Sequence, residues 1–238
     1  MRAAMTALPT RHDEAWRYSD IDALARAWPL PAPESIIVPA GGTFARTIIQ
    51  DSGTIHQLEI AIGKGATAAI HVLNIGGEYG RVELNVTLHE GADFKLGAVQ
   101  IGGGSQTLEV ITTVTHAEPG ATSSQIVRSV LAGTATGTYL GKVAVARDAQ
   151  QTDSVQSVKA MLLDRSATAN AKPELEIYAD DVKCAHGCAI GELDAMGLFY
   201  LQARGITPAE AKKLMLQAFV AGVFEGAADE ETLTEAAL

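Results

Sequence analysis

The chain has 238 residues, of which 47% are hydrophobic and 19% charged, so it can bury a sizeable core and is not globally disordered. Its formal net charge of −10, without any cluster of Lys and Arg, argues against nucleic-acid binding. No apolar run approaches the roughly 20 residues that a membrane span needs, and residues 1–16 lack an apolar signal core. We therefore expect a cytoplasmic protein that does not bind membranes.

Residues 1–35 are expected to form an N-terminal helical segment. A helix is predicted from Ser19, its N-cap, to Trp28, because apolar residues fall at i, i+3, i+4 and i+7 on one face. Three prolines follow closely and end this helix. The aromatic side chains of Trp16, Tyr18 and Trp28 are expected to anchor the segment to the main body.

Residues 36–190 change to a period of two, in which Val82, Leu84 and Val86 alternate with polar residues, as in strands. Turns with a Gly-Ala pair recur at intervals of roughly 30 residues, and such a repeat predicts a solenoid whose coils bury their inward faces on each other. These turns lie at 65–66, 91–92 and 120–121, with Asp148–Ala149 in a similar slot. A β-sandwich stays open on this pattern, although its turns usually recur every 8–12 residues. We favour a β-helix.

Residues 191–238 return to a helical period and are predicted to form a C-terminal helical domain. The clearest helix is predicted over 208–225. Thr207 is its N-cap, Pro208 occupies the first helical position, and Glu210 completes a capping box.

The helix predicted over 208–225 has an unusually wide apolar face. Leu216, Val220 and Phe224 form a second apolar row beside the main stripe, and Lys212 is the main interruption. A helix with one neighbour needs an apolar arc of only about 100°. Either the helix is buried within its own domain, or its own body covers one side and a partner protein the other. The sequence does not say which face would meet a partner.

Both cysteines of the chain lie in one C-x-H-x-C motif, formed by Cys184, His186 and Cys188. In a strand these three side chains point to the same face, where thiolates and an imidazole suit zinc or iron–sulfur chemistry. A closed tetrahedral site needs a fourth ligand, from a distant residue or another chain. The alternative is that the two thiols are small buried hydrophobic groups beside a hydrogen-bonded histidine.

Other catalytic motifs are missing from the sequence. There is no G-x-x-x-x-G-K-[ST] loop for ATP and no G-x-S-x-G nucleophile elbow. Two further hypotheses are a small zinc-binding protein and a β-helix enzyme acting on polysaccharide. The second is disfavoured because such sites usually expose aromatic side chains, which are only 5% of this chain.

Residues 172–191, KPELEIYADDVKCAHGCAIG, and the following ELDAMGLFYLQARGITPAEAKKLM resemble the C-terminal core of the SufB/SufD family, and its SufD branch in particular. The family supplies scaffold subunits for iron–sulfur cluster assembly. EAWRYSDIDAL near the N-terminus looks like the family's short aromatic entry motif. The resemblance implies a non-enzymatic protein, mainly β, with a right-handed parallel β-helix, a short N-terminal helix and a C-terminal helical segment. The N-terminal helical region is shorter here than is usual in the family.

The same resemblance implies two partners, which are a SufB-like subunit near the end of the β-helix and a SufC-like ABC-type ATPase at the C-terminal helices. His186 and Cys184 would face the SufB-like subunit and help to admit iron or hold a nascent cluster transiently, while Cys188 matches a variable position. No cofactor is expected to stay tightly bound to the isolated chain. The row of Leu216, Val220 and Phe224, with Lys212, would meet the ATPase. A homodimer through the SufB-facing surface is the alternative for the isolated chain.

Overall fold

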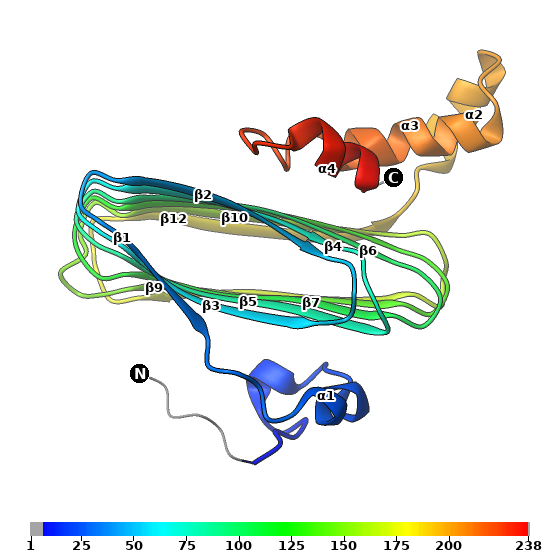
Figure 1. Ribbon diagram of the computed structural model, residues 1–238. Coiled ribbons are helices and arrows are strands. Elements are labelled where there is room, and N and C mark those ends of the chain that lie inside the picture. The colour runs from blue at the N-terminus through cyan, green and yellow to red at the C-terminus, as the bar shows by residue number, and fades with distance from the viewer. Residues whose placement is uncertain (1–6, 238) are drawn as a thin grey trace.

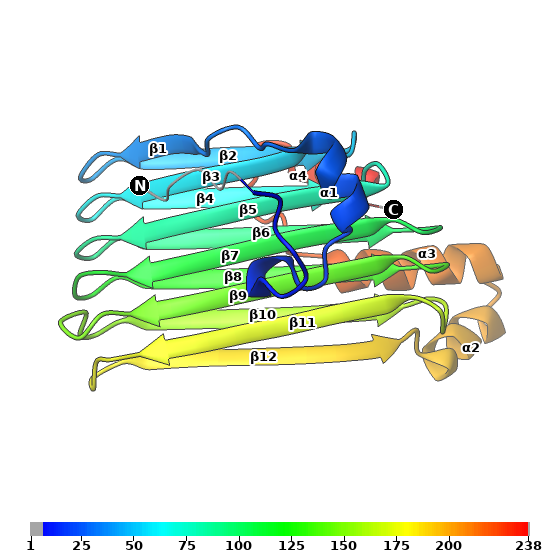
Figure 2. The same cartoon turned by 90° about the horizontal axis from the view of Figure 1, so that it is seen from below.

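The computed structural model describes residues 7–237, and its body is a parallel β-helix made of two facing sheets (Figure 1). Within that range sheet A has six strands, β1 (Glu34–Val38), β3 (Ile55–Ile62), β5 (Tyr79–Leu88), β7 (Thr107–His116), β9 (Thr136–Val145) and β11 (Thr168–Ile177). Sheet B has β2 (Thr43–Gln50), β4 (Thr67–Asn74), β6 (Asp93–Gly102), β8 (Thr122–Leu131), β10 (Asp153–Leu162) and β12 (Lys183–Glu192). The chain alternates between the sheets, so each coil adds one strand to each sheet (Figure 2). The predicted β-helix is confirmed, and the sandwich alternative was wrong.

The core of the β-helix is built from inward-facing columns of side chains. Neighbouring strands pair in register, so Val82 of β5 stacks on Val110 of β7, which stacks on Tyr139 of β9. All three side chains are buried, whereas the outward neighbour Asn85 is only half-buried. The alternation seen in the sequence therefore separates the core from the outer faces.

One corner of the β-helix repeats in every coil, as the turn pattern predicts. Gly65, Gly91 and Gly120 all have positive φ, and each donates its N–H to the carbonyl just before the corresponding residue of the next coil. The fourth slot was predicted at Asp148–Ala149; Ala149 is buried in the core with Ala66, Ala92 and Ala121, but Asp148 does not take the glycine position. The register places Gln151 there instead, with a φ of 60°, because the turn before β10 is longer.

The N-terminal segment crosses the outer face of sheet A (Figure 1). It contains a short 3-10 helix, η1 (Glu14–Trp16), and the helix α1 (Ile21–Ala27). The N-cap of α1 is Asp20, whose side chain accepts the N–H of Ala23, so the prediction of Ser19 as the cap was wrong. Ser19 instead donates its hydroxyl to Glu109 of β7, 2.9 Å away.

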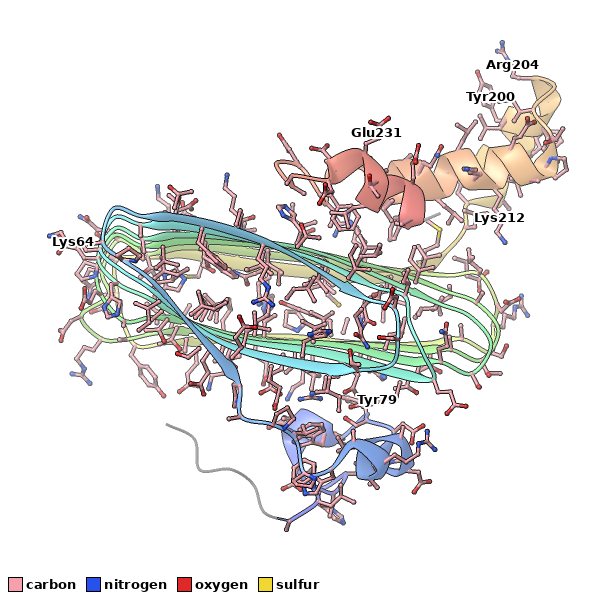
Figure 3. All side chains as sticks on the ribbon, in the orientation of Figure 1. Lys64, Tyr79, Tyr200, Arg204, Lys212 and Glu231 are labelled. Atoms are coloured by element: carbon pink, nitrogen blue, oxygen red, sulfur yellow. The ribbon has the colours of Figure 1, made fainter. Side chains whose placement is uncertain are left out.

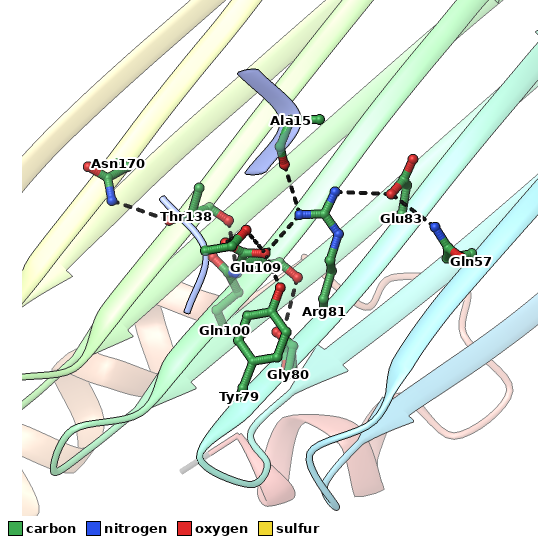
Figure 4. A network of polar contacts seen from close by, with 12 residues as sticks. Ala15, Gln57, Tyr79, Gly80, Arg81, Glu83, Gln100, Glu109, Thr138 and Asn170 are labelled. Atoms are coloured by element: carbon green, nitrogen blue, oxygen red, sulfur yellow. Dashed lines mark hydrogen bonds and ion pairs between the residues drawn. The ribbon is translucent and has the colours of Figure 1, made fainter. Parts of the chain in front are cut away.

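A buried ionic network fixes this segment to the sheet (Figure 4). The Arg81 guanidinium donates to Glu109 at 2.8 Å and to Glu83 at 3.0 Å, and also to the carbonyl of Ala15. It also lies 3.8 Å from the ring centroid of Trp16. Arg81 has no exposed surface, and removing it would leave the buried Glu109 carboxylate without its cationic partner, which typically costs about 3–5 kcal/mol. The predicted anchoring role is thus confirmed for Trp16 and for Trp28, which packs in the same cluster, and was wrong for Tyr18, which is exposed.

Up to residue 237, three helices follow β12, namely α2 (Ala195–Ala203), α3 (Pro208–Val220) and α4 (Glu230–Ala236). The predicted capping box of Thr207 and Glu210 begins α3. The end of α3, the next turn and α4 lie on the outer face of sheet B (Figure 1), where Val220, Phe224 and Leu233 pack on Leu73, Val99 and Val130.

Gly97 of β6 allows this close approach. A Cβ atom at Gly97 would lie 1.9 Å from the carbonyl oxygen of Val223, so the C-terminal segment could not dock in the same position above any larger residue. The anchored end of the helical region therefore depends on a backbone contact with sheet B.

One histidine lies wholly inside the β-helix. His116, at the end of β7, has no exposed surface, and its Nε2 lies 2.9 Å from the Ser123 hydroxyl. Burial lowers its pKa to about 4, and the backbone of Ala121 opposes part of that shift. An unfolded histidine has a pKa of about 6.5 and binds a proton more readily. The stability associated with neutral His116 is therefore complete above about pH 6.5 and is lost as the pH falls toward 4.

We predict that His116→Gln makes unfolding less sensitive to acid. The native protein should lose roughly 3 kcal/mol of unfolding free energy between pH 7 and pH 4 through His116, and the variant should not. Urea unfolding at both pH values measures this difference, with the exposed His12→Gln as the control. Equal acid losses in the native protein and His116→Gln would contradict the prediction.

Candidate functional site

The C-x-H-x-C motif lies on β12, the last strand of sheet B. Its register with β10 pairs Cys184 with Ser154 and His186 with Gln156, and it pairs Cys188 with a buried valine. Ser154 and Gln156 are buried inward-facing residues. The three residues of the motif therefore form one row that continues the inner face of sheet B.

No further strand of the described chain covers this row, because β12 is the edge of sheet B and β11 is the edge of sheet A. Cys184 is partly buried, whereas His186 and Cys188 are exposed. Partial burial and the nearby Asp153 carboxylate raise the pKa of the Cys184 thiol, while a hydrogen bond from the Ser154 backbone opposes the rise. The alternative, in which both thiols are buried hydrophobic groups, is therefore wrong for Cys188, whose side chain is exposed.

The row is not a complete metal site by itself. Across residues 7–237, no three His, Cys, Asp or Glu side chains are placed so that they could hold a metal ion together. Two thiols and one imidazole on an exposed strand can act as ligands only if further ligands come from outside the described chain. The three side chains alone therefore do not form a metal site.

The two ends of the β-helix differ in how they are finished. At the first coil, β1 has five residues, and Arg46 of β2 forms an ion pair with Glu34 at 2.6 Å. At the last coil, β11 and β12 each have ten residues, and Ile190 of β12 is 48% exposed. Long edge strands with unpaired backbone groups are templates for pairing with another chain, and short or charged strands oppose it. The open end, formed by β11 and β12, is thus the longer edge, although Lys172, Pro173 and Glu174 of β11 oppose pairing there.

A second exposed apolar surface lies on the hairpin of α2 and α3, which extends away from the β-helix (Figure 3). No residue of α2 is buried. Four large hydrophobic side chains are 47–73% exposed there, namely Met196, Phe199, Tyr200 and Leu214. We call these four residues the hairpin face. Figure 3 shows Tyr200 and Arg204 directed outward, with the guanidinium 5.1 Å from the ring centroid.

The predicted partner-binding row of Leu216, Val220 and Phe224 was wrong, because these side chains pack against the protein's own sheet B. Val220 and Phe224 are each 1% exposed and pack against sheet B, and Leu216 is partly buried in the same cluster. Helix α3 ends at Val220, so Phe224 belongs to the following turn. Lys212 alone of the predicted residues is exposed. The hairpin face remains uncovered instead.

A family model described as the SufBD core domain of the SUF system for FeS cluster assembly matches residues 35–219. The chain belongs to this family. It is 29% identical over 173 residues to the iron–sulfur cluster assembly protein SufD of Escherichia coli (strain K12), covering 72% of this chain and 41% of that protein.

Two further curated proteins are similar to parts of this chain. A SufBD family protein of Synechocystis sp. is 32% identical over 176 residues, covering 74% of this chain and 39% of that protein. The chloroplast protein ABCI7 of Arabidopsis thaliana is 40% identical over 121 residues, covering 50% of this chain and 26% of that protein. The chain thus spans 41% or less of the length of these three curated relatives.

In the part of the chain that the structure describes, no helix has the length and apolar character to cross a membrane.

The sequence predicts the row of Cys184, His186 and Cys188, here called the Cys/His row, but not the buried residues of β10 that lie beside it. Ser154 and Gln156 carry no motif, and their pairing with β12 joins segments about 30 residues apart that the sequence pattern does not align. The hairpin face was also missed, because the spacing of Met196 and Tyr200 indicates a shared face but not whether another element covers it.

Proposed function

We propose that this chain is a non-enzymatic scaffold subunit of a SufBCD-type iron–sulfur cluster assembly complex. The observation that carries the proposal is the open end of the β-helix, where an unpaired edge presents Cys184, His186 and Cys188 from its inner face. A SufB-like subunit that pairs with β11 and β12 would cover this row and supply the missing ligands. Family membership and the relative named SufD support this choice of partner.

Iron or a nascent cluster is the cargo of this site in the proposal. Thiolate and imidazole ligands suit iron–sulfur chemistry, and each must lose a proton or stay neutral to bind metal. Because the row is incomplete in the isolated chain, iron would be held only transiently and at the interface. Both cysteines are free thiols, which suits a reducing cytoplasm.

We assign the ABC-type ATPase partner to the hairpin face. Hydrophobic side chains exposed together on one hairpin are typical of a protein-binding surface, and aromatic residues often dominate binding energy. Leu214 also lines a groove of about 420 Å³ beside Ile206, which could accept a partner side chain. The chain has no ATP-binding loop of its own, so nucleotide hydrolysis would come from the partner.

A second copy of this chain is the competing occupant of the open end. The same unpaired edges of β11 and β12 would allow a homodimer when the SufB-like subunit is absent. A zinc-binding protein is a second function compatible with the Cys/His row, and metal analysis of the purified chain separates it from the scaffold.

We predict that His186→Ala impairs cluster formation without preventing assembly. The chain would be co-expressed with the SufB-like and SufC-like proteins of its own source. Because a ligand is lost, cluster yield should fall by about 10-fold or more, while light scattering gives the same molar mass for the complex. His12→Ala, at an exposed histidine of the N-terminal segment, is the control. Unchanged cluster yield would contradict a role for His186.

We also predict that Phe199→Ser combined with Tyr200→Ser weakens binding of the SufC-like ATPase. Losing two aromatic contacts should cost about 2 kcal/mol or more, which is roughly a 30-fold rise in Kd. Calorimetric titration measures this change. Ile37→Ser is the matched control, because Ile37 is 77% exposed on β1, far from the hairpin. If the double variant and Ile37→Ser bind the ATPase with equal affinity, the hairpin face is not its binding surface.

A further inference from the structure

Two polar columns line the inside of sheet B and end at the Cys/His row. Register pairing continues Ser123 of β8 into Ser154 of β10 and then into Cys184 of β12. In the neighbouring column, Gln125 continues into Gln156 and then into His186. The serines and glutamines are at most 4% exposed. Most other inward positions of the β-helix are apolar, so polar side chains here need a physical reason.

Gln156 has one end of its amide fixed and the other end free. Its Nε2 donates to the hydroxyl of Tyr139 at 3.2 Å, and that hydroxyl also lies 3.0 Å from Thr112 Oγ1. Its Oε1 has no hydrogen-bond partner among the described residues, although the side chain is only 1% exposed. A buried acceptor left unpaired typically costs about 1–3 kcal/mol. The free oxygen is therefore a site that can accept a hydrogen bond.

His186 is the neighbour of Gln156 on the open side of the same column. Adjacent strands lie about 4.8 Å apart, and both side chains start from the inner face. In the serine column, Ser123 Oγ and Ser154 Oγ are 2.8 Å apart, whereas Gln125 and Gln156 of the glutamine column make no hydrogen bond with each other, so Gln156 Oε1 stays free for its other neighbour. The strand spacing is thus short enough for an imidazole N–H at position 186 to reach the free amide oxygen after rotation of its side chain.

We propose that Gln156 is a positioning residue for His186, whose ring N–H it accepts at Oε1. This bond fixes the tautomer of His186 and leaves the other ring nitrogen free to face iron at the interface. Metal-binding histidines commonly donate their second nitrogen to such an acceptor, which sets the direction of the ring. The inference rests on the proposed function of the open end, but the hydrogen bond itself requires no partner subunit.

The test uses the metal-free full chain and compares three variants by long-range ¹H–¹⁵N NMR at alkaline pH, where the imidazole is neutral. Gln156→Leu removes the acceptor, Gln156→Glu retains one, and Gln125→Leu removes the corresponding amide one coil farther from His186. The exposed His12 gives the reference tautomer ratio within each spectrum.

We expect the tautomer ratio of His186 to differ from that of His12 in the native chain. The difference should persist in Gln156→Glu and Gln125→Leu and disappear in Gln156→Leu. A native ratio equal to that of His12, or equal shifts in both Leu variants, overturns the proposal.

Cluster formation in the assembled complex gives a second, separable result. Gln156→Leu should lower the rate of cluster formation by about 10- to 100-fold relative to Gln125→Leu. A slow His186→Ala variant beside a normal Gln156→Leu variant would overturn the positioning role and leave the proposed function intact. If His186→Ala forms clusters normally, the proposed function fails at His186, whatever the NMR spectra show for Gln156.

Discussion

Each coil of the β-helix is stabilised by the coil beside it, and this constraint leaves the last coil incomplete. Stacked strands share both their backbone hydrogen bonds and their inward side chains, as Val82, Val110 and Tyr139 do. The last strands of the chain, β11 and β12, have such a neighbour on one side only. The Cys/His row is exposed for this reason, since the same inward positions one coil earlier are buried.

The outer faces of the two sheets are covered by different kinds of contact. On sheet A, the N-terminal segment is fixed by Arg81, whose guanidinium pairs with Glu83 and Glu109 and packs against the ring of Trp16. On sheet B, the end of α3 and α4 are fixed by apolar packing around Phe224 and by the close approach at Gly97. These contacts anchor the base of the hairpin of α2 and α3 and leave its tip exposed. In the proposed complex, the tip and the open end would serve different partners.

Local patterns predicted much of this architecture. Alternation in residues such as Val82 and Leu84 marked the strands, and Thr207 with Glu210 marked the start of α3, because these signals depend on neighbours in the sequence. Contacts between distant segments were not predictable in this way. Ser19 looked like a helix cap, but its partner Glu109 lies 90 residues away.

The candidate site was predictable only in part, for the same reason. The spacing of Cys184, His186 and Cys188 was enough to place them on one face of a strand. The buried residues beside them, Ser154 and Gln156, are set by the pairing of β10 with β12, which local spacing does not reveal. The apolar spacing of α3 and the following turn did not show which residues are covered, and burial is spread over both rows, with Val220 and Phe224 on one and Ala211 and Val223 on the other.

The central claim is that the open end pairs with another subunit of the SufBD family. Hydrogen–deuterium exchange of the chain, alone and mixed with the SufB-like protein of its own source, tests this most directly. The account predicts slower exchange on mixing for amides of β11 and β12 that point away from β9 and β10, with β1 unchanged. Protection confined to β1 and β2, or no protection anywhere, would contradict it.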